Sequence, residues 1–380
     1  MKKNTPACLA LLSFFLISQN SYSQKNWPVI KATSKTMDIK EGDVLKKGTW
    51  TIVPEAKPDV HKTSAKKVTF YSDIENISFN INPKVGTYNF IVLLNGKDSA
   101  WTQIQYQQPF LEKLKGAKKY NPADARYVPK FTYQPADNAQ LAKIRKDLSL
   151  DSIAGTGNEV SQILNLLHWV HNTIRHDGSS DNPAVKNALG IIQACKSGNR
   201  GVNCRMMATV LNDCYLAMGI KSRHITCMPK ETQFDDCHVI NMVYSKDLQR
   251  WLWIDPTFDA YVMDEKGELL GPREVRERLI NNKALILNPD ANWNKKNSQT
   301  KEDYLDNYMA KNLYRLQTPL VSEYDLETGK TGKEIIYVEL LPLDGLLQEP
   351  QKTEQIEKAT GVKFITYKTN NPELFWKKPE

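Results

Sequence analysis

The sequence predicts an α+β fold, in which a helix that carries a cysteine packs on an antiparallel sheet after a small all-β domain. Apolar residues recur at helical spacing from residue 158 onward, and runs rich in β-branched and aromatic residues follow at 222–228, 237–245 and 250–256. Residues 24–110 hold only strand-like runs separated by turn signals. Helices followed by strands are typical of α+β domains. The length of 380 residues exceeds one ordinary domain, so more than one is expected.

The first residues have the pattern of a secretory signal peptide. Two lysines precede an apolar stretch at 7–17, which is too short to span a bilayer, since a span needs about 20 residues. Ser21 and Ser23 are the small residues that a signal peptidase requires, and Gln24 follows them. We therefore predict that residues 1–23 are removed before Gln24 and that the mature protein is periplasmic or secreted.

Composition and charge exclude two classes of partner. Hydrophobic residues make up 41% of the chain and charged residues 25%, as in soluble globular proteins. The formal charge is +8, or +6 without the two lysines of the signal peptide, but no dense basic run with interleaved aromatic residues occurs. No later apolar run approaches 18 residues. We expect no nucleic-acid partner and no stable membrane insertion, while the oligomeric state stays open.

The mature chain divides into four predicted segments. Residues 24–115 read as a β-sandwich-like accessory domain, because their short strand-like runs follow one another about every ten to twenty residues. Residues 116–157 form a polar, proline-containing linker with room for one short helix. Residues 158–290 form the α+β core, and residues 291–380 form a C-terminal α/β extension packed on that core.

The helices of the core are bounded by residues that start or stop helices. These are Asn158 and Asp177-Gly178 for the first helix, Pro183 for the start of the second, and Asn203 and Gly219 for the third. The three predicted strands follow, and a further helix covers 272–280.

Five cysteines remain after residue 23, and their odd number indicates at least one free thiol in an exported protein. They are Cys195, Cys204, Cys214, Cys227 and Cys237. A disulfide scaffold would spread its cysteines along the chain, whereas these lie within 43 residues. Cys227 and Cys237 are placed to pair across neighbouring strands, but the sequence leaves their disulfide state open.

Cys204 is the best candidate for a reactive thiol. A helix that begins near Asn203 places Cys204 in its first turn, on the same buried face as Ala208. There the thiol feels the positive end of the helix dipole, which lowers a cysteine pKa from about 8.5 towards the range of about 3.5–7.5. Cys214 lies in the helix interior and reads as a packing residue.

A histidine and an aspartate on the next two strands can complete a catalytic group. His238 begins one strand, Asp255 ends the next, and the connecting stretch reads as a hairpin turn. If Tyr244 pairs with Gln249, His238 lies directly opposite Asp255 on one face of the sheet. Below them, Ile240–Trp253 and Met242–Trp251 pairs would form the apolar face on which the Cys204 helix packs.

These three residues have the roles of a Cys-His-Asp triad. Cys204 is the nucleophile, His238 accepts and returns its proton, and Asp255 orients the imidazole. The Cys204 backbone N–H is one oxyanion donor, and the sequence does not name the second.

No cofactor and no metal site are expected. His168, His171 and His176 lie on or just after one helix, but no metal-binding motif accompanies them, so we interpret all three as structural.

The chain resembles the transglutaminase-like superfamily, which shares the papain-type cysteine-enzyme core, over about residues 155–280. The motifs that carry the resemblance are "WVHNTIRHDG", a cysteine-led helix running into "AMGIKSRHIT", "CHVINMVYS" and "RWLWIDPTFD". The resemblance implies that Cys204, His238 and Asp255 match the catalytic residues of that superfamily. Two departures concern the substrate site: Asn203 replaces the commoner small or acidic residue, and Cys237 adjoins the histidine.

The expected function is an exported enzyme that cleaves or transfers a peptide, isopeptide or carboxamide acyl group through a thioester. The resemblance implies a protease or amidase rather than a cross-linking enzyme, with a peptide, protein or glycopeptide as substrate. Two alternatives stay open. One is a non-catalytic transglutaminase-like module that binds cell-wall or carbohydrate partners. The other is a glycopeptide amidase that uses the same three residues.

Overall fold

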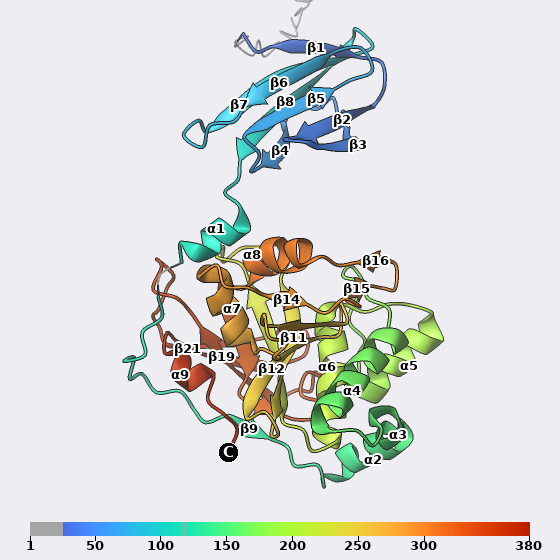
Figure 1. The fold of residues 1–380 in the computed structure, drawn as a ribbon, viewed down its shortest axis with the longest axis vertical. Coiled ribbons are helices and arrows are strands. Elements are labelled where there is room, and N and C mark those ends of the chain that lie inside the picture. The colour runs from blue at the N-terminus through green and yellow to red at the C-terminus, as the bar shows by residue number, and fades with distance from the viewer. Residues whose placement is uncertain (1–25, 118) are drawn as a thin grey trace, which may run out of the picture. The chain divides into compact units, whose positions relative to one another are not determined.

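The computed structural model describes residues 26–117 and 119–380, so the predicted signal peptide lies outside the described residues. The chain divides into two compact units, Met1–Gln108 and Pro109–Glu380 (Figure 1). Among the described residues, no helix combines the length and the apolar character that a membrane span requires.

The described part of the first unit is all-β, as predicted. Two four-stranded sheets have the orders β1-β7-β8-β4 and β3-β2-β5-β6. The strands are β1 Val29–Ala32, β2 Thr36–Glu41, β3 Val44–Thr51, β4 Asp59–Thr63, β5 Lys67–Tyr71, β6 Asn76–Asn80, β7 Thr87–Leu94 and β8 Asp98–Tyr106. Phe70 and Phe90 pack at the core between the sheets, with ring centroids 5.0 Å apart. The sequence did not indicate β1, β2 and β4, because these runs are short or rich in polar residues and become strands by pairing with β7, β5 and β8.

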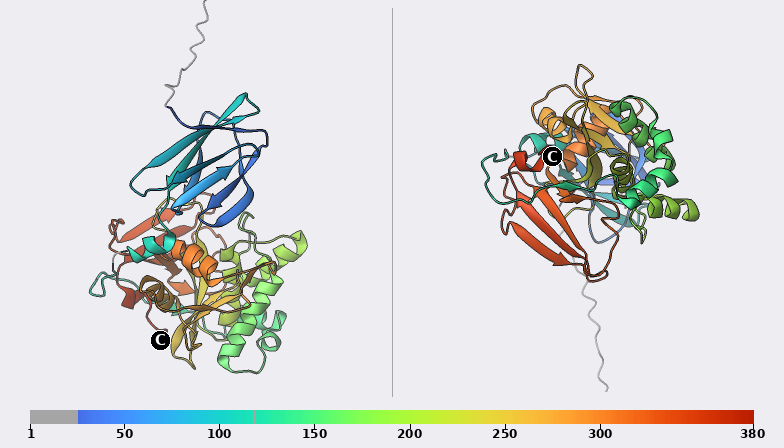
Figure 2. Two further views of the ribbon diagram at one scale, coloured as in Figure 1. Left: turned by 45° about the horizontal axis from the view of Figure 1, so that its top comes forward. Right: turned by 90° about the horizontal axis from the view of Figure 1, so that it is seen from below.

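The second unit is built on one nine-stranded sheet with the order β14-β13-β12-β11-β10-β17-β19-β21-β20. Its strands are β10 Ser222–Met228, β11 His238–Ser245, β12 Arg250–Asp255, β13 Ala260–Met263, β14 Ile286–Leu287, β17 Arg315–Pro319, β19 Glu334–Leu340, β20 Lys352–Ile356 and β21 Lys363–Thr369. The remaining strands are the short pairs β9 Thr132–Tyr133 with β18 Val321–Ser322, and β15 Asn292–Trp293 with β16 Asn297–Ser298. Because β10 pairs with β11 on one side and β17 on the other, the C-terminal strands continue the core sheet (Figure 2).

The helices of this unit lie over both faces of the sheet. They are α1 Phe110–Lys115, α2 Ala139–Asp147, α3 Leu150–Ala154, α4 Glu159–Thr173, α5 Ala188–Gly198, α6 Cys204–Ala217, α7 Pro272–Ile280, the π-helix η1 Glu302–Met309, α8 Ala310–Asn312 and α9 Pro372–Phe375. Figure 1 shows α4, α5 and α6 together beside the central strands β11 and β12. A part-buried ion pair joins α6 to the C-terminal region, because Arg205 Nη1 lies 2.7 Å from Glu327 Oε1.

Two of the predicted helix boundaries need correction. The second helix does not begin near Pro183 but at Ala188, because the Asn187 side chain caps it by accepting a hydrogen bond from the Gly190 N–H at 3.0 Å. The first helix ends at Thr173, before the Asp177-Gly178 turn. The start of α6 agrees with the prediction, since Asn203 caps the helix and Cys204 is its first residue.

The predicted register of the β11–β12 hairpin was wrong by two residues. Met242 pairs with Trp253, and Ser245 pairs with Arg250, so the loop covers 246–249. The turn is thus displaced by one residue along the chain, and Gln249 takes a left-handed φ of 53° at its last position. A shift by two residues preserves the face on which each side chain projects. His238 and Asp255 therefore stay on one face, as diagonal neighbours rather than as an opposed pair.

The predicted packing face of the cysteine helix was also wrong. Helix α6 packs on the face that carries Val243, Leu252 and Ile254. The opposite face, with Met242 and Trp253, packs against η1, α7 and α8. Both faces of β11 are apolar and buried, so the apolar pattern did not show which one receives the helix.

Candidate active site

Cys204 is the first residue of α6, and local sequence fixes it there. The Asn203 side chain accepts a hydrogen bond from the Met206 N–H at 3.2 Å, which caps the helix. The Cys204 N–H stands at a position where an α-helix offers no carbonyl partner. The thiol is half-buried and has both this N–H and the positive end of the helix dipole beside it.

His238 and Asp255 form a buried pair. His238 Nε2 lies 2.6 Å from Asp255 Oδ2, and the two side chains are 1% and 0% exposed. With Nε2 bound to the carboxylate, Nδ1 is the ring nitrogen that remains for proton exchange. Because His238 is the first residue of β11, its ring lies at the end of the strand, close enough to the Cys204 thiol for each group to shift the pKa of the other.

Asp255 is held from two further directions. Its Oδ1 accepts a hydrogen bond from the Thr257 N–H at 2.9 Å. Its Oδ2 accepts one from the Tyr304 hydroxyl at 2.6 Å, and Tyr304 itself accepts from Trp253 Nε1 at 3.0 Å. This chain of bonds runs from β12 to η1 and fixes the carboxylate against the imidazole.

Replacing Tyr304 by phenylalanine tests that chain of bonds. A hydrogen bond to a charged group contributes about 1.5–3 kcal/mol, and the change also leaves Trp253 Nε1 without its acceptor. We expect Tyr304→Phe to lower the free energy of unfolding in urea by more than Tyr215→Phe does. The hydroxyl of Tyr215 donates to the neutral Ile163 carbonyl, a bond of about 0.5–1.5 kcal/mol. If Tyr304→Phe lost no more unfolding free energy than Tyr215→Phe, the result would contradict the hydrogen-bond chain from Trp253 through Tyr304 to Asp255.

The electrostatics favour an ion pair between Cys204 and His238. Burial raises the pKa of the Cys204 thiol, but hydrogen bonds from His176 and His238 and their charges outweigh burial and lower it to about 6. Burial lowers the pKa of His238, but the Asp255 carboxylate and the Cys204 thiolate outweigh it and raise it to about 10. Between these values, thiolate and imidazolium coexist.

The pKa shifts of the other four cysteines have the opposite direction to that of Cys204. All five described cysteines are free, so Cys227 and Cys237 are not paired with each other. Burial raises the pKa of each of the remaining four thiols: Cys195, Cys214, Cys227 and Cys237. Cys214 is fully buried in the middle of α6, as its interpretation as a packing residue predicted.

Two aromatic rings, those of Phe258 and Tyr308, lie against the imidazole of His238. The ring centroids of Phe258 and Tyr308 lie 5.5 Å and 5.2 Å from the imidazole centroid. The Tyr308 hydroxyl lies 3.4 Å from His238 Nδ1. These rings limit the access of water to the nitrogen that exchanges a proton with the thiol.

His176 is a site residue that the sequence analysis interpreted as structural. It follows α4, and its ring is close enough to the Cys204 thiol to lower the pKa of that thiol. Its Nδ1 accepts a hydrogen bond from Trp293 Nε1 at 3.0 Å. No signal in the sequence pointed to this contact, because Trp293 lies 117 positions further along the chain.

The other two histidines of that region have structural partners. His168 Nδ1 lies 2.7 Å from Asp259 Oδ1. His171 lies between the Pro256 carbonyl and Asn292, at 3.0 Å from each. The described residues contain no group of three or more candidate metal ligands.

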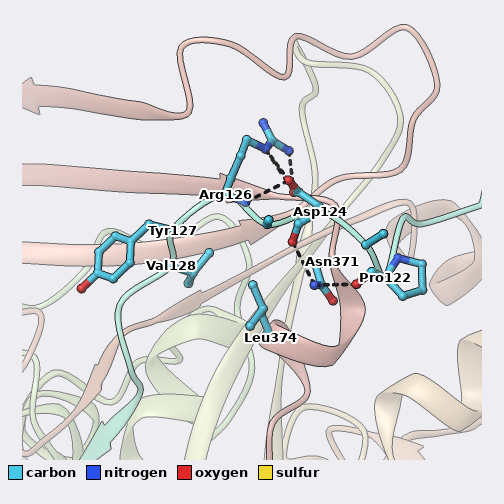
Figure 3. A pocket seen from close by; sticks show the side chains of 9 residues that line it. Pro122, Asp124, Arg126, Tyr127, Val128, Asn371 and Leu374 are labelled. Atoms are coloured by element: carbon cyan, nitrogen blue, oxygen red, sulfur yellow. Dashed lines mark hydrogen bonds and ion pairs between the residues drawn. The ribbon is translucent and has the colours of Figure 1, made fainter.

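A surface pocket of about 430 Å³ lies elsewhere in this unit, along the 122–128 segment and α9. Figure 3 shows Asp124 and Arg126 paired on its wall, and Asn371 bound to the backbone of the same segment. None of the predicted site residues lines it.

Comparison with known proteins gives one family match and several similar structures. Residues 146–256 match the model of the transglutaminase-like superfamily, and this range includes all three predicted site residues. A Cytophaga hutchinsonii protein provisionally described as a cysteine protease is 21% identical, with a TM-score of 0.26, over 33% of this chain and 40% of that one. Red sea bream transglutaminase is 13% identical, with a TM-score of 0.22, over 61% of this chain and 49% of that one. This chain therefore spans less than half the length of either structure. No curated protein matches it.

The matched segment carries the cysteine-led helix α6 and the hairpin that presents the histidine and the aspartate. Residues 146–256 of this chain are a transglutaminase-like domain.

Proposed function

We propose that this protein is an exported cysteine hydrolase that cleaves a peptide, isopeptide or carboxamide bond through a thioester at Cys204. The observation that carries the proposal is the placement of the Cys204 thiol at a helix start, against a histidine that is paired with a buried aspartate. A thiol that is ionised near neutral pH beside a protonated imidazole is the arrangement that cysteine nucleophiles use.

The acylation step follows from these positions. The Cys204 thiolate attacks the carbonyl carbon, the S–C bond forms, and the carbonyl π electrons move to oxygen. The oxyanion accepts a hydrogen bond from the Cys204 N–H. As the tetrahedral intermediate collapses, the C–N bond breaks, and His238 Nδ1 gives its proton to the leaving amine or ammonia.

In deacylation, neutral His238 takes a proton from water as the water oxygen attacks the thioester carbonyl. The C–S bond then breaks, and the thiolate and imidazolium are restored. An amine in place of water would give acyl transfer by the same steps. We propose water as the acceptor, because the resemblance to the transglutaminase-like superfamily implies hydrolysis rather than cross-linking.

A labelling experiment tests the nucleophile without knowledge of the substrate. We expect a low dose of iodoacetamide near pH 6 to modify Cys204 selectively, because the pKa of the other four thiols is raised by burial. Peptide mass spectrometry locates the label, and Cys204→Ser should abolish it. Slow and equal labelling of all five cysteines would contradict the proposal and favour a non-catalytic binding module.

Substrate class and acceptor need a second measurement. Peptide, isopeptide and glycopeptide amides are to be compared for release of amine or ammonia, with and without an added primary amine. Hydrolysis predicts a free carboxylate as product in both conditions, while incorporation of the amine would identify a transferase. Cleavage of glycopeptides alone would identify a glycopeptide amidase.

Export is also part of the proposal and rests on the sequence of residues 1–23. We expect the mature protein to begin at Gln24 when expressed with its own N-terminal residues. Intact-mass analysis of the periplasmic or secreted fraction measures this directly, and an unprocessed chain would contradict it.

A further inference from the structure

Tyr308 brings a hydroxyl group next to the reacting nitrogen of His238. Its oxygen lies 3.4 Å from His238 Nδ1, and its ring centroid lies 5.2 Å from the imidazole centroid. Nδ1 is the nitrogen that exchanges a proton, because the Asp255 carboxylate binds Nε2 at 2.6 Å. A direct hydrogen bond between nitrogen and oxygen prefers about 2.7–3.2 Å. The longer approach at Nδ1 therefore leaves both groups able to bind a third partner between them.

The ring of Tyr308 is held in this position by two neighbours. Phe258 packs against it with ring centroids 5.8 Å apart, and the Lys311 ammonium lies 5.2 Å from its centroid. Lys311 in turn pairs with Asp236, which lies two residues before His238 in the sequence. The hydroxyl is thus placed before any substrate binds, so little freedom remains to be lost when it acts.

Helix η1 contacts both ends of the His238–Asp255 pair. Tyr304 donates to the carboxylate at 2.6 Å, and Tyr308, four residues later, lies at the other nitrogen of the imidazole. π-helical segments are rare and occur frequently at functional sites. Tyr304 and His238 are buried, whereas Tyr308 is part-exposed. Water that reaches the buried imidazole on this side therefore meets the Tyr308 hydroxyl.

We propose that the Tyr308 hydroxyl and His238 Nδ1 together hold the water that hydrolyses the thioester. The inference rests on the proposed thioester chemistry at Cys204 and concerns its second half. The water donates one hydrogen to neutral Nδ1 and the other to the Tyr308 oxygen. A lone pair of the water oxygen attacks the thioester carbonyl carbon, and the proton passes to Nδ1. The C–S bond then breaks, and the thiolate leaves with the electron pair of that bond.

The hydroxyl can accept this hydrogen bond because it keeps its own proton. Burial raises the pKa of Tyr308, and the Asp236 carboxylate raises it further. A neutral hydroxyl has two lone pairs with which to accept a hydrogen bond from water. Acylation uses no water, so only deacylation should depend on the hydroxyl.

The reaction with p-nitrophenyl acetate separates the two halves. The initial phase of p-nitrophenol release follows acetylation of Cys204, and the steady state follows hydrolysis of the acetyl-enzyme. Tyr308→Phe removes the hydroxyl and keeps the ring that packs on His238. The matched control is Tyr261→Phe, since Tyr261 is half-buried on β13 and packs in the core on the α6 side of the sheet.

For Tyr308→Phe, we expect an initial phase as fast as in the wild type and a steady-state rate lower by about 10-fold, because one hydrogen bond to the attacking water is lost. Acetylated Cys204 should accumulate, which peptide mass spectrometry detects. The pH inflections of iodoacetamide alkylation should match those of the wild type, because the thiolate–imidazolium pair is intact. Tyr261→Phe should behave as wild type in each measurement.

The outcomes distinguish failure of the inference from failure of the proposed function. Wild-type protein in which Cys204 is not acetylated would overturn the proposed function. Acetylation in the wild type, with an equal steady-state rate in Tyr308→Phe, would overturn the role of Tyr308 alone. Equal slowing of both phases would also overturn it, since it would indicate a structural effect on His238. Circular dichroism monitors the fold. If Tyr308→Phe does not fold, Tyr308→Leu, which also lacks the hydroxyl, is judged by the same criteria.

Discussion

Replacing His238 by alanine should lower the rate of substrate acylation by about 10²–10⁴-fold, because the group that protonates the leaving amine is lost. The same change removes the imidazolium that stabilises the Cys204 thiolate. The pKa of the thiol should therefore rise from about 6 towards the ordinary cysteine value of about 8.5. The pH profile of iodoacetamide alkylation measures this, and the rate near pH 6 should fall by about two orders of magnitude.

The direction of this pH dependence follows from the shifted pKa values of Cys204 and His238. In the wild type, the reactive form is gained as pH rises through about 6, where Cys204 ionises, and is lost as pH rises through about 10, where His238 loses its proton. Between these limits the rate of acylation should be flat. The control is His168→Ala, since His168 is part-exposed and pairs with Asp259. An unchanged inflection in His238→Ala would show that His238 does not act on the thiol.

Replacing Asp255 by asparagine should give the second large effect, a fall of about 10⁴-fold by analogy with removal of the carboxylate in a serine triad. The carboxylate is fully buried and is what keeps His238 protonated despite its own burial. Without it, burial of His238 dominates and the imidazole becomes neutral at lower pH. The ion pair with Cys204 then exists over a narrower pH range. The alkaline limb of the pH profile of acylation should therefore shift to lower pH.

The matched control for Asp255→Asn is Asp236→Asn. Asp236 is two residues from His238 along the chain, but its side chain is 51% exposed and pairs with Lys311. Exposed pairs contribute little, so neither limb of the pH profile should move. Equal profiles for the two variants would contradict a role of Asp255 that acts through His238.

The sequence predicted where the three candidate residues lie in the fold, because each of these positions depends on local rules. A capping asparagine placed Cys204 at a helix start, and strand patterns placed His238 and Asp255 at strand ends. The register error of two residues left them on one face, because side chains alternate with a period of two. An error of one residue would have separated them.

The features that the sequence did not predict depend on long-range contacts. The choice of face for α6 was not specified, because β11 is buried on both sides. The position of His176 near Cys204 depends on Trp293 and Asn294, which reach it from β15 and the turn that follows. Proline is favoured in the first turn of a helix, so local preference alone pointed to Pro183. The helix instead begins at Ala188, where the Asn187 side chain caps it.

The continuation of the core sheet by the C-terminal strands bears on how this domain can be divided. Strand β10 lies in the middle of the sheet only because β17 covers one of its edges. Removal of the chain beyond α8 would leave that edge unpaired, as a template for aggregation. It would also remove Glu327 from Arg205, the residue next to the nucleophile. The stretch that matches the family model is therefore not a detachable module, because β17 and Glu327, which complete its architecture, lie beyond its last residue.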